Sequence, residues 1–221
     1  CTIEPNTGRV AVPDTRLTAL AELANSKTVI PTHLEFVDIA GLVRGASKGE
    51  GLGNQFLGNI REVDAIAHVL RCFEDGEITH VDGDVDPVRD AATVETELML
   101  ADIDSLERRM TALVKKSRGG DKDSKADLAI MEKIFAHLSG GQPARSTPSL
   151  TDDETARLPH LQLLTAKPVL YVCNVAESDA ATGNAYCQLV ANKAAAEGAA
   201  YVIVSAAVSY THLTLPTILL V

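Results

Sequence analysis

The chain has 221 residues, enough for one large domain or two small ones. Hydrophobic residues make up 46% and charged residues 23% of it, a balance that supports a folded core and excludes an intrinsically disordered protein. The formal net charge of −10 argues against a nucleic-acid-binding protein that works through its overall field, although it leaves room for a local basic patch. The sequence has no long apolar span and no signal peptide, so we expect a cytoplasmic protein without a membrane partner.

The first part of the chain alternates short strand patterns with helical ones. Residues 8–12 alternate and stop at Pro13, as an edge strand would, and Asp14 can cap the helix that follows. Further along, residues 34–37 read as a strand, the apolar spacing near Phe56 as a helix, and residues 65–73 as another strand. Strands alternating with helices predict a parallel sheet. His68 lies within an apolar strand, where a core histidine is expected.

The period changes in the middle of the chain. Apolar residues spaced four and three apart predict two long helices whose seams pack together as in a coiled coil. Gly119-Gly120 separates these helices and Gly140-Gly141 ends the second, which predicts an antiparallel hairpin. The seam residues are Met99, Ile103, Leu106, Met110 and Leu113, then Leu128, Met131, Phe135 and Leu138.

The sheet pattern returns after the hairpin. Thr151 and Glu154 form a capping-box pattern for a short helix. A strand is then expected after Pro168, over 169–175, followed by a helix from about 185 to 197 and a strand over 201–206. Four cysteines lack the spacing of a metal-binding motif, so buried reduced thiols are expected. They are Cys1, Cys72, Cys173 and Cys187.

One stretch carries most of the functional information. The strand at 34–37 ends in Asp38, followed by Ala40-Gly41, and five glycines occur from Gly41 to Gly53 inclusive. In an open α/β sheet, ligands bind at the carboxyl ends of the strands. A strand that ends in Asp-x-x-Gly and enters a glycine-rich loop is typical of a nucleotide switch. Asp-x-x-Gly alone is more often a surface loop after a core strand, and the glycine-rich continuation favours the switch.

Residues 38–56 resemble switch II of the Obg-related P-loop NTPases. Together with residues 1–6 and 71–74, they make the chain similar to Obg-like ATPases of the YchF type, over residues 1 to about 207. The chain contains no Gly-x-x-x-x-Gly-Lys-[Ser/Thr]. In this family the phosphate loop lies ahead of the Thr2 segment, so we expect an N-terminal truncation and an inactive fragment.

The resemblance implies a G-domain-like P-loop NTPase fold of the α/β class, with a mostly parallel sheet and an inserted antiparallel helical hairpin. It implies ATP hydrolysis to ADP and phosphate, with Mg²⁺ as cofactor. By the same resemblance Thr2 is the switch I threonine in the Mg²⁺ shell, Asp38 an outer-shell Mg²⁺ carboxylate, and Gly41 a γ-phosphate amide. Leu42 stands where Ras-like enzymes have the glutamine that orients water. Leucine cannot orient water, so the catalytic group is not identified.

Base recognition is expected at two strand ends. Asn174-Val175-Ala176-Glu177 stands where guanine-specific relatives have Asn-Lys-x-Asp, and Ser205-Ala206 resembles the loop that completes the base pocket. The missing Lys and the longer Glu177 disfavour a bidentate guanine contact, so ATP is expected over GTP. Backbone groups of Val175 could meet adenine, with Asn174 shaping the loop; the alternative is that Glu177 tolerates both bases. Phe73 could lie against the base, although a core aromatic is the more common role of a lone Phe.

The resulting domain prediction has four parts: residues 1–82 and 166–207 for the NTPase domain, 83–165 for the helical insertion, and 208–221 for a tail that is not native. The tail contains no Lys, Arg, Asp or Glu. Basic residues gather at the hairpin tip, and such a run is usually a solvated face. The family's association with the ribosome makes ribosomal RNA a candidate partner for three of them, Lys115, Lys116 and Arg118.

Two rival functions remain open. The first is a GTP-hydrolysing Obg relative, and nucleotide competition would separate it from an ATPase. The second is a nucleotide-independent scaffold that binds RNA or protein through the hairpin. A scaffold predicts that partner binding is unchanged when nucleotide is removed.

Overall fold

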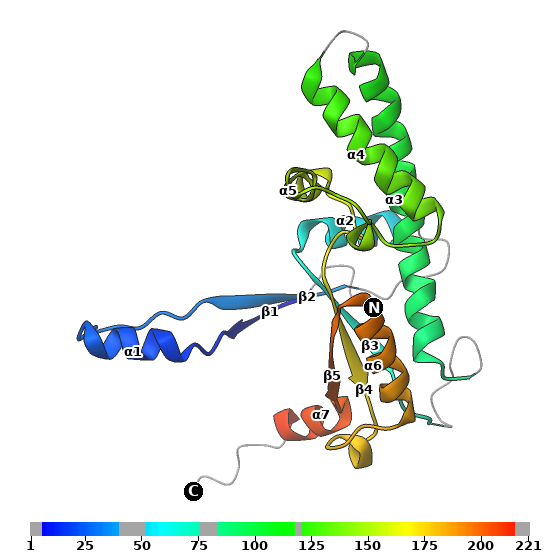
Figure 1. Ribbon diagram of the computed structural model, residues 1–221. Coiled ribbons are helices and arrows are strands. Elements are labelled where there is room, and N and C mark those ends of the chain that lie inside the picture. The colour runs from blue at the N-terminus through cyan, green and yellow to red at the C-terminus, as the bar shows by residue number, and fades with distance from the viewer. Residues whose placement is uncertain (1–5, 40–51, 76–83, 118–120, 215–221) are drawn as a thin grey trace, which may run out of the picture. The chain divides into compact units, whose positions relative to one another are not determined.

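The structure of the chain is a computed structural model that describes residues 6–39, 52–75, 84–117 and 121–214 (Figure 1). It divides into two compact units, residues 1–42 and residues 43–221, which are described separately. No helix in the described parts of the chain is both long enough and apolar enough to span a membrane.

The first unit is a two-stranded antiparallel ribbon with a helix in its connection. Strand β1 (Asn6–Ala11) pairs with β2 (His33–Asp38), and α1 (Thr15–Leu23) lies between them in sequence. As expected, Asp14 caps α1, its side chain accepting a hydrogen bond from the Arg16 backbone N–H at 2.9 Å. All residues of β1 are exposed. A two-stranded ribbon of this kind is at best marginally stable by itself.

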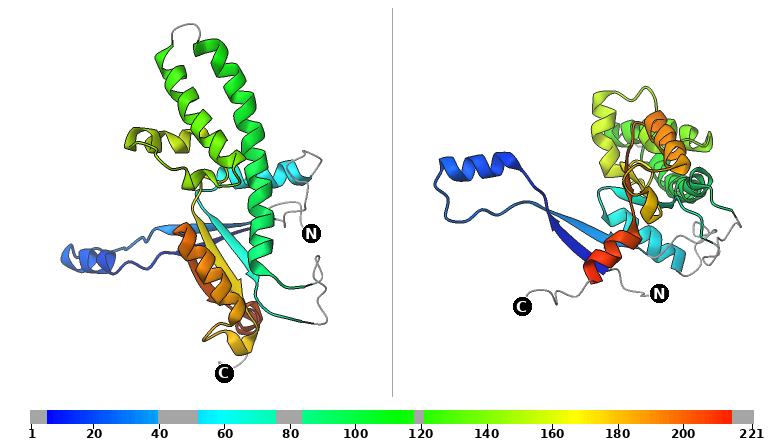
Figure 2. Two further views of the ribbon diagram at one scale, coloured as in Figure 1. Left: turned by 45° about the vertical axis from the view of Figure 1, so that its right-hand side comes forward. Right: turned by 90° about the horizontal axis from the view of Figure 1, so that it is seen from below.

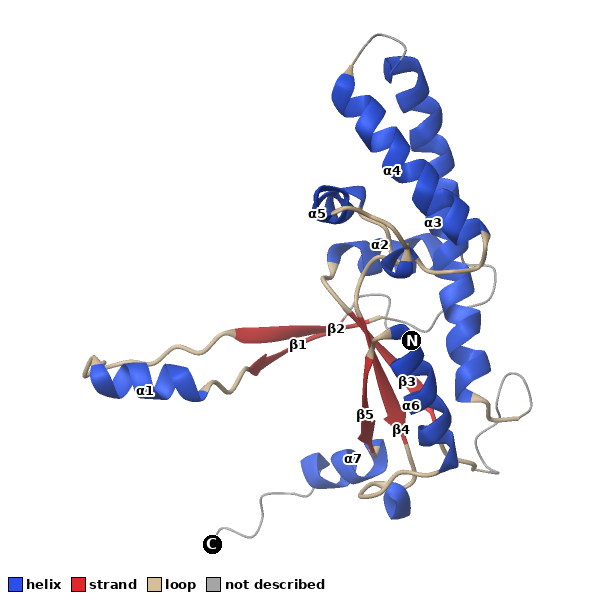
Figure 3. Ribbon diagram, in the orientation of Figure 1, coloured by secondary structure: helices blue, strands red, loops and turns tan. Residues whose placement is uncertain are grey.

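The second unit contains a three-stranded parallel sheet in the order β3-β4-β5 (Figure 3). The strands are β3 (Ile66–Arg71), β4 (Val169–Asn174) and β5 (Ala200–Val204). Strands β3 and β4 are separated by about a hundred residues of sequence, and most of these residues form the helical insertion. The predicted parallel α/β sheet with an inserted hairpin is therefore confirmed.

Helices cover one face of this sheet. Helix α3 (Pro87–Ser117) packs against β3, and α6 (Ala185–Glu197) packs against β4, β5 and α3. The strand side chains that alternate toward these helices are buried; they include Leu70, Tyr171 and Cys173, and buried Val190 of α6 belongs to the same cluster. On the opposite face Val69 is 63% exposed and Val202 40% exposed.

The helical insertion is the antiparallel hairpin that the sequence predicts. Helix α4 (Lys122–Ser139) runs back along α3, as the left view in Figure 2 shows, and ends at Gly140. Eight of the nine predicted seam residues belong to one apolar cluster or pack against it, and Leu106, Met131 and Leu138 are fully buried there. The ninth, Leu128, is half-buried and is not part of this cluster. Gly119-Gly120 lies outside the described residues.

The chain returns to the sheet through short elements. They are η2 (Ala144–Ser146) and α5 (Asp152–Leu161), after which β4 begins, while η3 (Glu177–Asp179) and α7 (Ala206–Thr214) follow β4 and β5. The remaining helix, α2 (Leu52–Glu62), precedes β3. The capping box of Thr151 and Glu154 is present at the start of α5. Residues 208–214 belong to α7, and the four domain boundaries stay predictions.

A charge network connects the insertion to the sheet. Arg145 of η2 pairs with Glu95 of α3 and, at 3.1 Å, with Glu197 of α6. Lys193 of α6 pairs with the same two carboxylates, and the Tyr171 hydroxyl donates to Glu197 at 2.7 Å. The Arg145 and Lys193 side chains are each 15% exposed. Because every charge has an opposite partner, the network can be largely buried without an isolated ion.

Candidate functional site

The carboxyl ends of the parallel strands form the candidate site. Strand β3 is followed by Cys72-Phe73, β4 ends at Asn174, and β5 is followed by Ser205-Ala206. Ligands of open α/β sheets bind outside this edge. The structure therefore brings together the base-recognition residues that the sequence predicts on the second unit.

Asn174 connects all three strand ends. Its side-chain Oδ1 accepts a hydrogen bond from the Ala206 backbone N–H at 2.9 Å, and its backbone carbonyl accepts one from the Cys72 N–H at 2.8 Å. Asn174 thereby fixes the loop after β5 against the end of β4, and its predicted role in base recognition stays a prediction.

Val175 has fewer backbone groups available to bind a base than expected. Its side chain is 2% exposed, and its backbone N–H donates to the Val204 carbonyl at 2.9 Å. This N–H already has its acceptor within the sheet, so it cannot also meet a base. Any contact from Val175 to adenine would have to come from its carbonyl oxygen.

Two further candidates differ in exposure. Glu177 opens η3 and is exposed, so its carboxylate faces solvent. Ser205 is 6% exposed, and its Oγ is buried with no hydrogen-bond partner among the described groups. An unpaired buried hydroxyl costs free energy, so a ligand that bonds to Ser205 would remove that cost.

Phe73 is half-buried at the end of β3. The Arg71 guanidinium carbon lies 4.9 Å from the centre of the Phe73 ring, and its Nε donates to the Phe73 carbonyl at 3.0 Å. One face of the ring is thus covered by a cation. Sequence reasoning did not find this role for Arg71, because its spacing from Phe73 is ordinary for a strand end.

Of the expected phosphate and metal residues, the structure describes Asp38. Asp38 is the last residue of β2 and is exposed, in the first unit. Thr2, Gly41 and Leu42 lie outside the described residues, as does Arg118. Their expected roles stay predictions.

Three thiols next to this edge were expected to be buried, and they are. The sequence did not predict that they meet. Hydrogen bonds from Cys72 and Cys187 lower the pKa of the Cys173 thiol to about 7, even though burial opposes this change. The hydrogen bond to Cys173, together with burial, raises the pKa of Cys72.

A cavity also lies among α3, η2 and α6. This cavity of about 310 Å³ is lined by α3, residues 141–146 and the end of α6 around Lys193 and Glu197. Helix α6 runs back from the carboxyl edge toward the start of β5. This cavity therefore opens near the amino ends of the strands, away from the base-recognition residues.

Comparison with known proteins decides the family. Residues 1–114 match the family described as 50S ribosome-binding GTPase. The chain belongs to this family. The matched region includes β1 to β3 and most of α3, while the segments around Asn174 and Ser205 lie beyond it.

Relatives of the family confirm the resemblance to YchF-type Obg-like proteins. The chain is 53% identical over 208 residues to the ribosome-binding ATPase YchF of Haemophilus ducreyi, covering 94% of this chain and 57% of that protein. It is 48% identical to the ribosome-binding ATPase YchF of Bacillus subtilis, covering 93% and 57%.

A solved structure supports the same assignment. The Schizosaccharomyces pombe YchF GTPase aligns with a TM-score of 0.74 and 39% identity, over 92% of this chain and 56% of that one. The chain thus spans little more than half the length of the family members it matches.

Proposed function

We propose that this chain forms the switch and base-recognition parts of a Mg²⁺-dependent nucleotide hydrolase that prefers ATP and acts at the ribosome. The observation that carries the proposal is the bond from the Ala206 N–H to Asn174 Oδ1. It joins the two base-recognition segments at the edge where the sheet is expected to bind its ligand.

The relatives are named both ATPase and GTPase, so the choice between adenine and guanine has to be argued from the residues of this chain. The preference for ATP rests on Val175 and Glu177. A guanine-specific site has a lysine whose stem covers the base; here that position is a buried valine, and its side chain belongs to the core. Glu177 is exposed and one methylene longer than the aspartate of a guanine site, so its carboxylate reaches a different point.

The phosphate side of the proposal rests on Asp38, Thr2 and Gly41. A carboxylate and a hydroxyl are hard oxygen ligands, which is the donor type that Mg²⁺ prefers. When bound with nucleotide, the ion would neutralise charge that develops on the phosphate oxygens. Asp38 is exposed at the end of β2 and free to act as an outer-shell ligand. Leu42 offers no polar group, so water must be oriented by another residue.

The proposed ribosome contact is the hairpin tip. Arg108, Lys116 and Lys125 are exposed cations on α3 and α4. Arg109 is different, since its guanidinium donates to the Leu161 carbonyl and so supports the fold. On a chain of net charge −10, an exposed basic tip is a specific place for phosphate contacts. Localisation in the cytoplasm follows from this ribosomal role and is part of the proposal.

Nucleotide competition tests the base choice. We suggest an extended chimera, in which the segment ahead of the equivalent of Cys1 in the H. ducreyi relative is joined to this chain, so that the implied phosphate loop is present. ATP should displace a fluorescent nucleotide better than GTP. Glu177→Asp should move the preference toward GTP by about 10-fold, the effect of one charge-assisted hydrogen bond.

Glu107→Asp, the same change at an exposed position of α3, should leave the preference unchanged. Val175→Lys is avoided because it would bury an ammonium group in the core. A chimera that prefers GTP before any substitution would show that the ATP assignment is wrong.

A further inference from the structure

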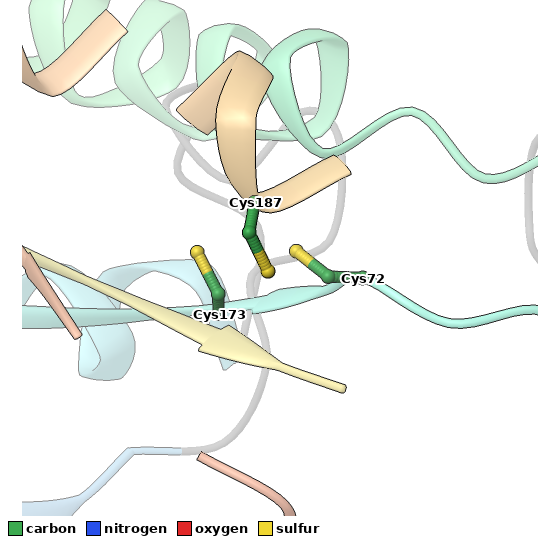
Figure 4. A group of neighbouring side chains, drawn as sticks. All are labelled: Cys72, Cys173 and Cys187. Atoms are coloured by element: carbon green, nitrogen blue, oxygen red, sulfur yellow. The ribbon is translucent and has the colours of Figure 1, made fainter. Parts of the chain in front are cut away.

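Three of the chain's four cysteines meet inside the second unit (Figure 4). Cys72 follows β3, Cys173 lies in β4, and Cys187 lies in the first turn of α6. The three Sγ atoms all lie within 4.8 Å of one another, and Figure 4 shows the three side chains as neighbours. Cys72 and Cys173 are 0% exposed and Cys187 is 4% exposed.

We propose that Cys72, Cys173 and Cys187 form a binding site for a soft, thiolate-preferring cation held by three sulfurs, with Cu(I) as the matching ion. This site is separate from the proposed Mg²⁺ and nucleotide roles and does not depend on them. The argument rests on the distances, on the way the three backbones are fixed, and on the surroundings.

The distances suit three-coordinate binding. Metal–thiolate bonds of about 2.3 Å in a flat trigonal site place the sulfurs about 4.0 Å apart. The present separations of at most 4.8 Å need to close by less than about 1 Å to reach that arrangement. A disulfide would instead need two sulfurs to approach to about 2.05 Å and would leave the third without a role.

The backbones that carry the thiols are held together by Asn184. Its Nδ2 donates to the Cys72 carbonyl at 2.8 Å, and its Oδ1 accepts from the Cys187 N–H at 3.2 Å. The Cys72 N–H donates to the Asn174 carbonyl beside Cys173. The three ligands are thus positioned before any ion arrives, which lowers the cost of ordering them on binding.

The residues around the three thiols shield them from water. A Cβ on Gly183, whose φ is +72°, would lie 3.5 Å from the Cys187 Sγ and 2.7 Å from Ile203 Cδ1, so the backbone approaches the cluster closely here. Buried Leu70, Val175 and Val190 belong to the same core cluster. Such a shell excludes water and hard oxygen ligands, and soft thiolates favour Cu(I) and Zn(II) over Mg²⁺.

Coordination number decides between the two soft ions. Structural Zn²⁺ takes four protein ligands. Within the described residues the cluster offers three, with no further His, Cys, Asp or Glu in the group. Binding replaces thiol protons: one Cu(I) and three thiols give a complex of Cu(I) with three thiolates, and three protons pass to the buffer. The ion offsets one of the three thiolate charges, so the complex carries two negative charges.

The test is an anaerobic Cu(I) titration of the reduced 221-residue chain against a chromophoric Cu(I) chelator. It is done in a Cys1→Ser background, so that only the three clustered thiols remain. We expect one tightly held Cu(I) per chain, three sulfur neighbours at about 2.3 Å in X-ray absorption, and no displacement by excess Zn(II). Single changes of Cys72, Cys173 or Cys187 to Ala should each weaken binding at least about 100-fold, and Asn184→Ala by about 10-fold to 100-fold.

Thermal unfolding separates the folded site from loose thiols, even if an alanine variant fails to fold. Cu(I) should raise the unfolding midpoint of the Cys1→Ser chain, because an ion that binds only the native state stabilises it. A midpoint that falls, more than one tightly bound ion per chain, or Zn(II) that competes equally would each overturn the proposal.

Discussion

Asp102 is expected to be one of the most costly residues to replace in the second unit. It lies on α3 and is 1% exposed. Its Oδ1 accepts from the Leu164 N–H at 2.8 Å, and its Oδ2 accepts from the Thr165 N–H at 2.8 Å and the Thr165 hydroxyl at 2.7 Å. The same hydroxyl oxygen accepts from the Ala144 N–H at 3.1 Å. One carboxylate therefore holds the hairpin to the segment that leads into β4.

The magnitude follows from the groups left unpaired. In Asp102→Ala, two backbone N–H groups and one hydroxyl lose their hydrogen-bond acceptor in the interior, and each unpaired group costs about 1–3 kcal/mol. The variant no longer buries a carboxylate, which offsets part of this cost. We therefore expect a loss of about 3–5 kcal/mol in the free energy of unfolding. Asp102→Asn keeps one acceptor oxygen and should cost about 2 kcal/mol. Asp104→Ala, at an exposed position on the same helix, should stay within about 0.5 kcal/mol.

Urea denaturation followed by circular dichroism measures these differences, and hydrogen exchange at the Leu164 and Thr165 amides locates them. Protection of both amides should fall in Asp102→Ala and stay intact in Asp104→Ala. The reasoning is refuted if Asp102→Ala costs less than about 1 kcal/mol, or if both amides remain protected.

The pH dependence of the same residue has a definite sign. Burial raises the pKa of Asp102 above its ordinary value of 3.8, although hydrogen bonds from Thr165 and Leu164 oppose the change. Because the pKa of Asp102 is raised in the folded state, the contribution of this carboxyl group to stability is fully present below pH 3.8. It is lost as the pH rises through the folded-state pKa. The stability difference between the wild type and Asp102→Asn should therefore narrow as the pH rises from 3.8.

Two further predictions concern titration and charge. Burial lowers the pKa of His68 below its ordinary value of 6.5, and the negative charge of Glu95 opposes this change. The contribution of His68 to folding stability is therefore present above pH 6.5 and is lost as the pH falls through the lowered pKa. The urea midpoint should fall on acidification below pH 6.5 more steeply in the wild type than in His68→Gln; equal slopes would exclude His68 as the cause. In the extended chimera, replacing Lys115, Lys116 and Arg118 together by Glu should weaken ribosome association and flatten its salt dependence, with little change in ATPase rate. An unchanged salt slope would assign these residues to a solvated face.

Local signals explain why much of the fold could be predicted. The seam of Leu106, Met131 and Leu138 follows from apolar spacing alone, because side chains three and four residues apart share one face of a helix. The capping box of Thr151 and Glu154 was visible for the same reason, since both hydrogen bonds join residues within one turn.

Non-local contacts explain what was missed. Asp102 is one acidic residue in a long helix, and nothing near it in sequence shows that Leu164 and Thr165 will donate to it. The spacing of cysteines in sequence indicates a metal site when the ligands come from one loop. Here Cys72 follows β3 and Cys173 lies in the neighbouring parallel strand β4, so their distance in sequence reflects the size of the helical insertion.

Asn174 shows how a motif and a fold constrain the same residue. The resemblance placed it in base recognition, and the structure gives it a second task, accepting from Ala206 through its side chain and from Cys72 through its backbone. An aspartate could accept the same bond, but it would add a charge next to the buried Cys173 thiol and oppose its ionisation. A neutral amide fixes the loop after β5 without that cost. Asn174, which we propose for base recognition, is therefore adjacent in β4 to Cys173 of the thiol cluster, so a substitution at Cys173 is expected to alter the contacts of Asn174.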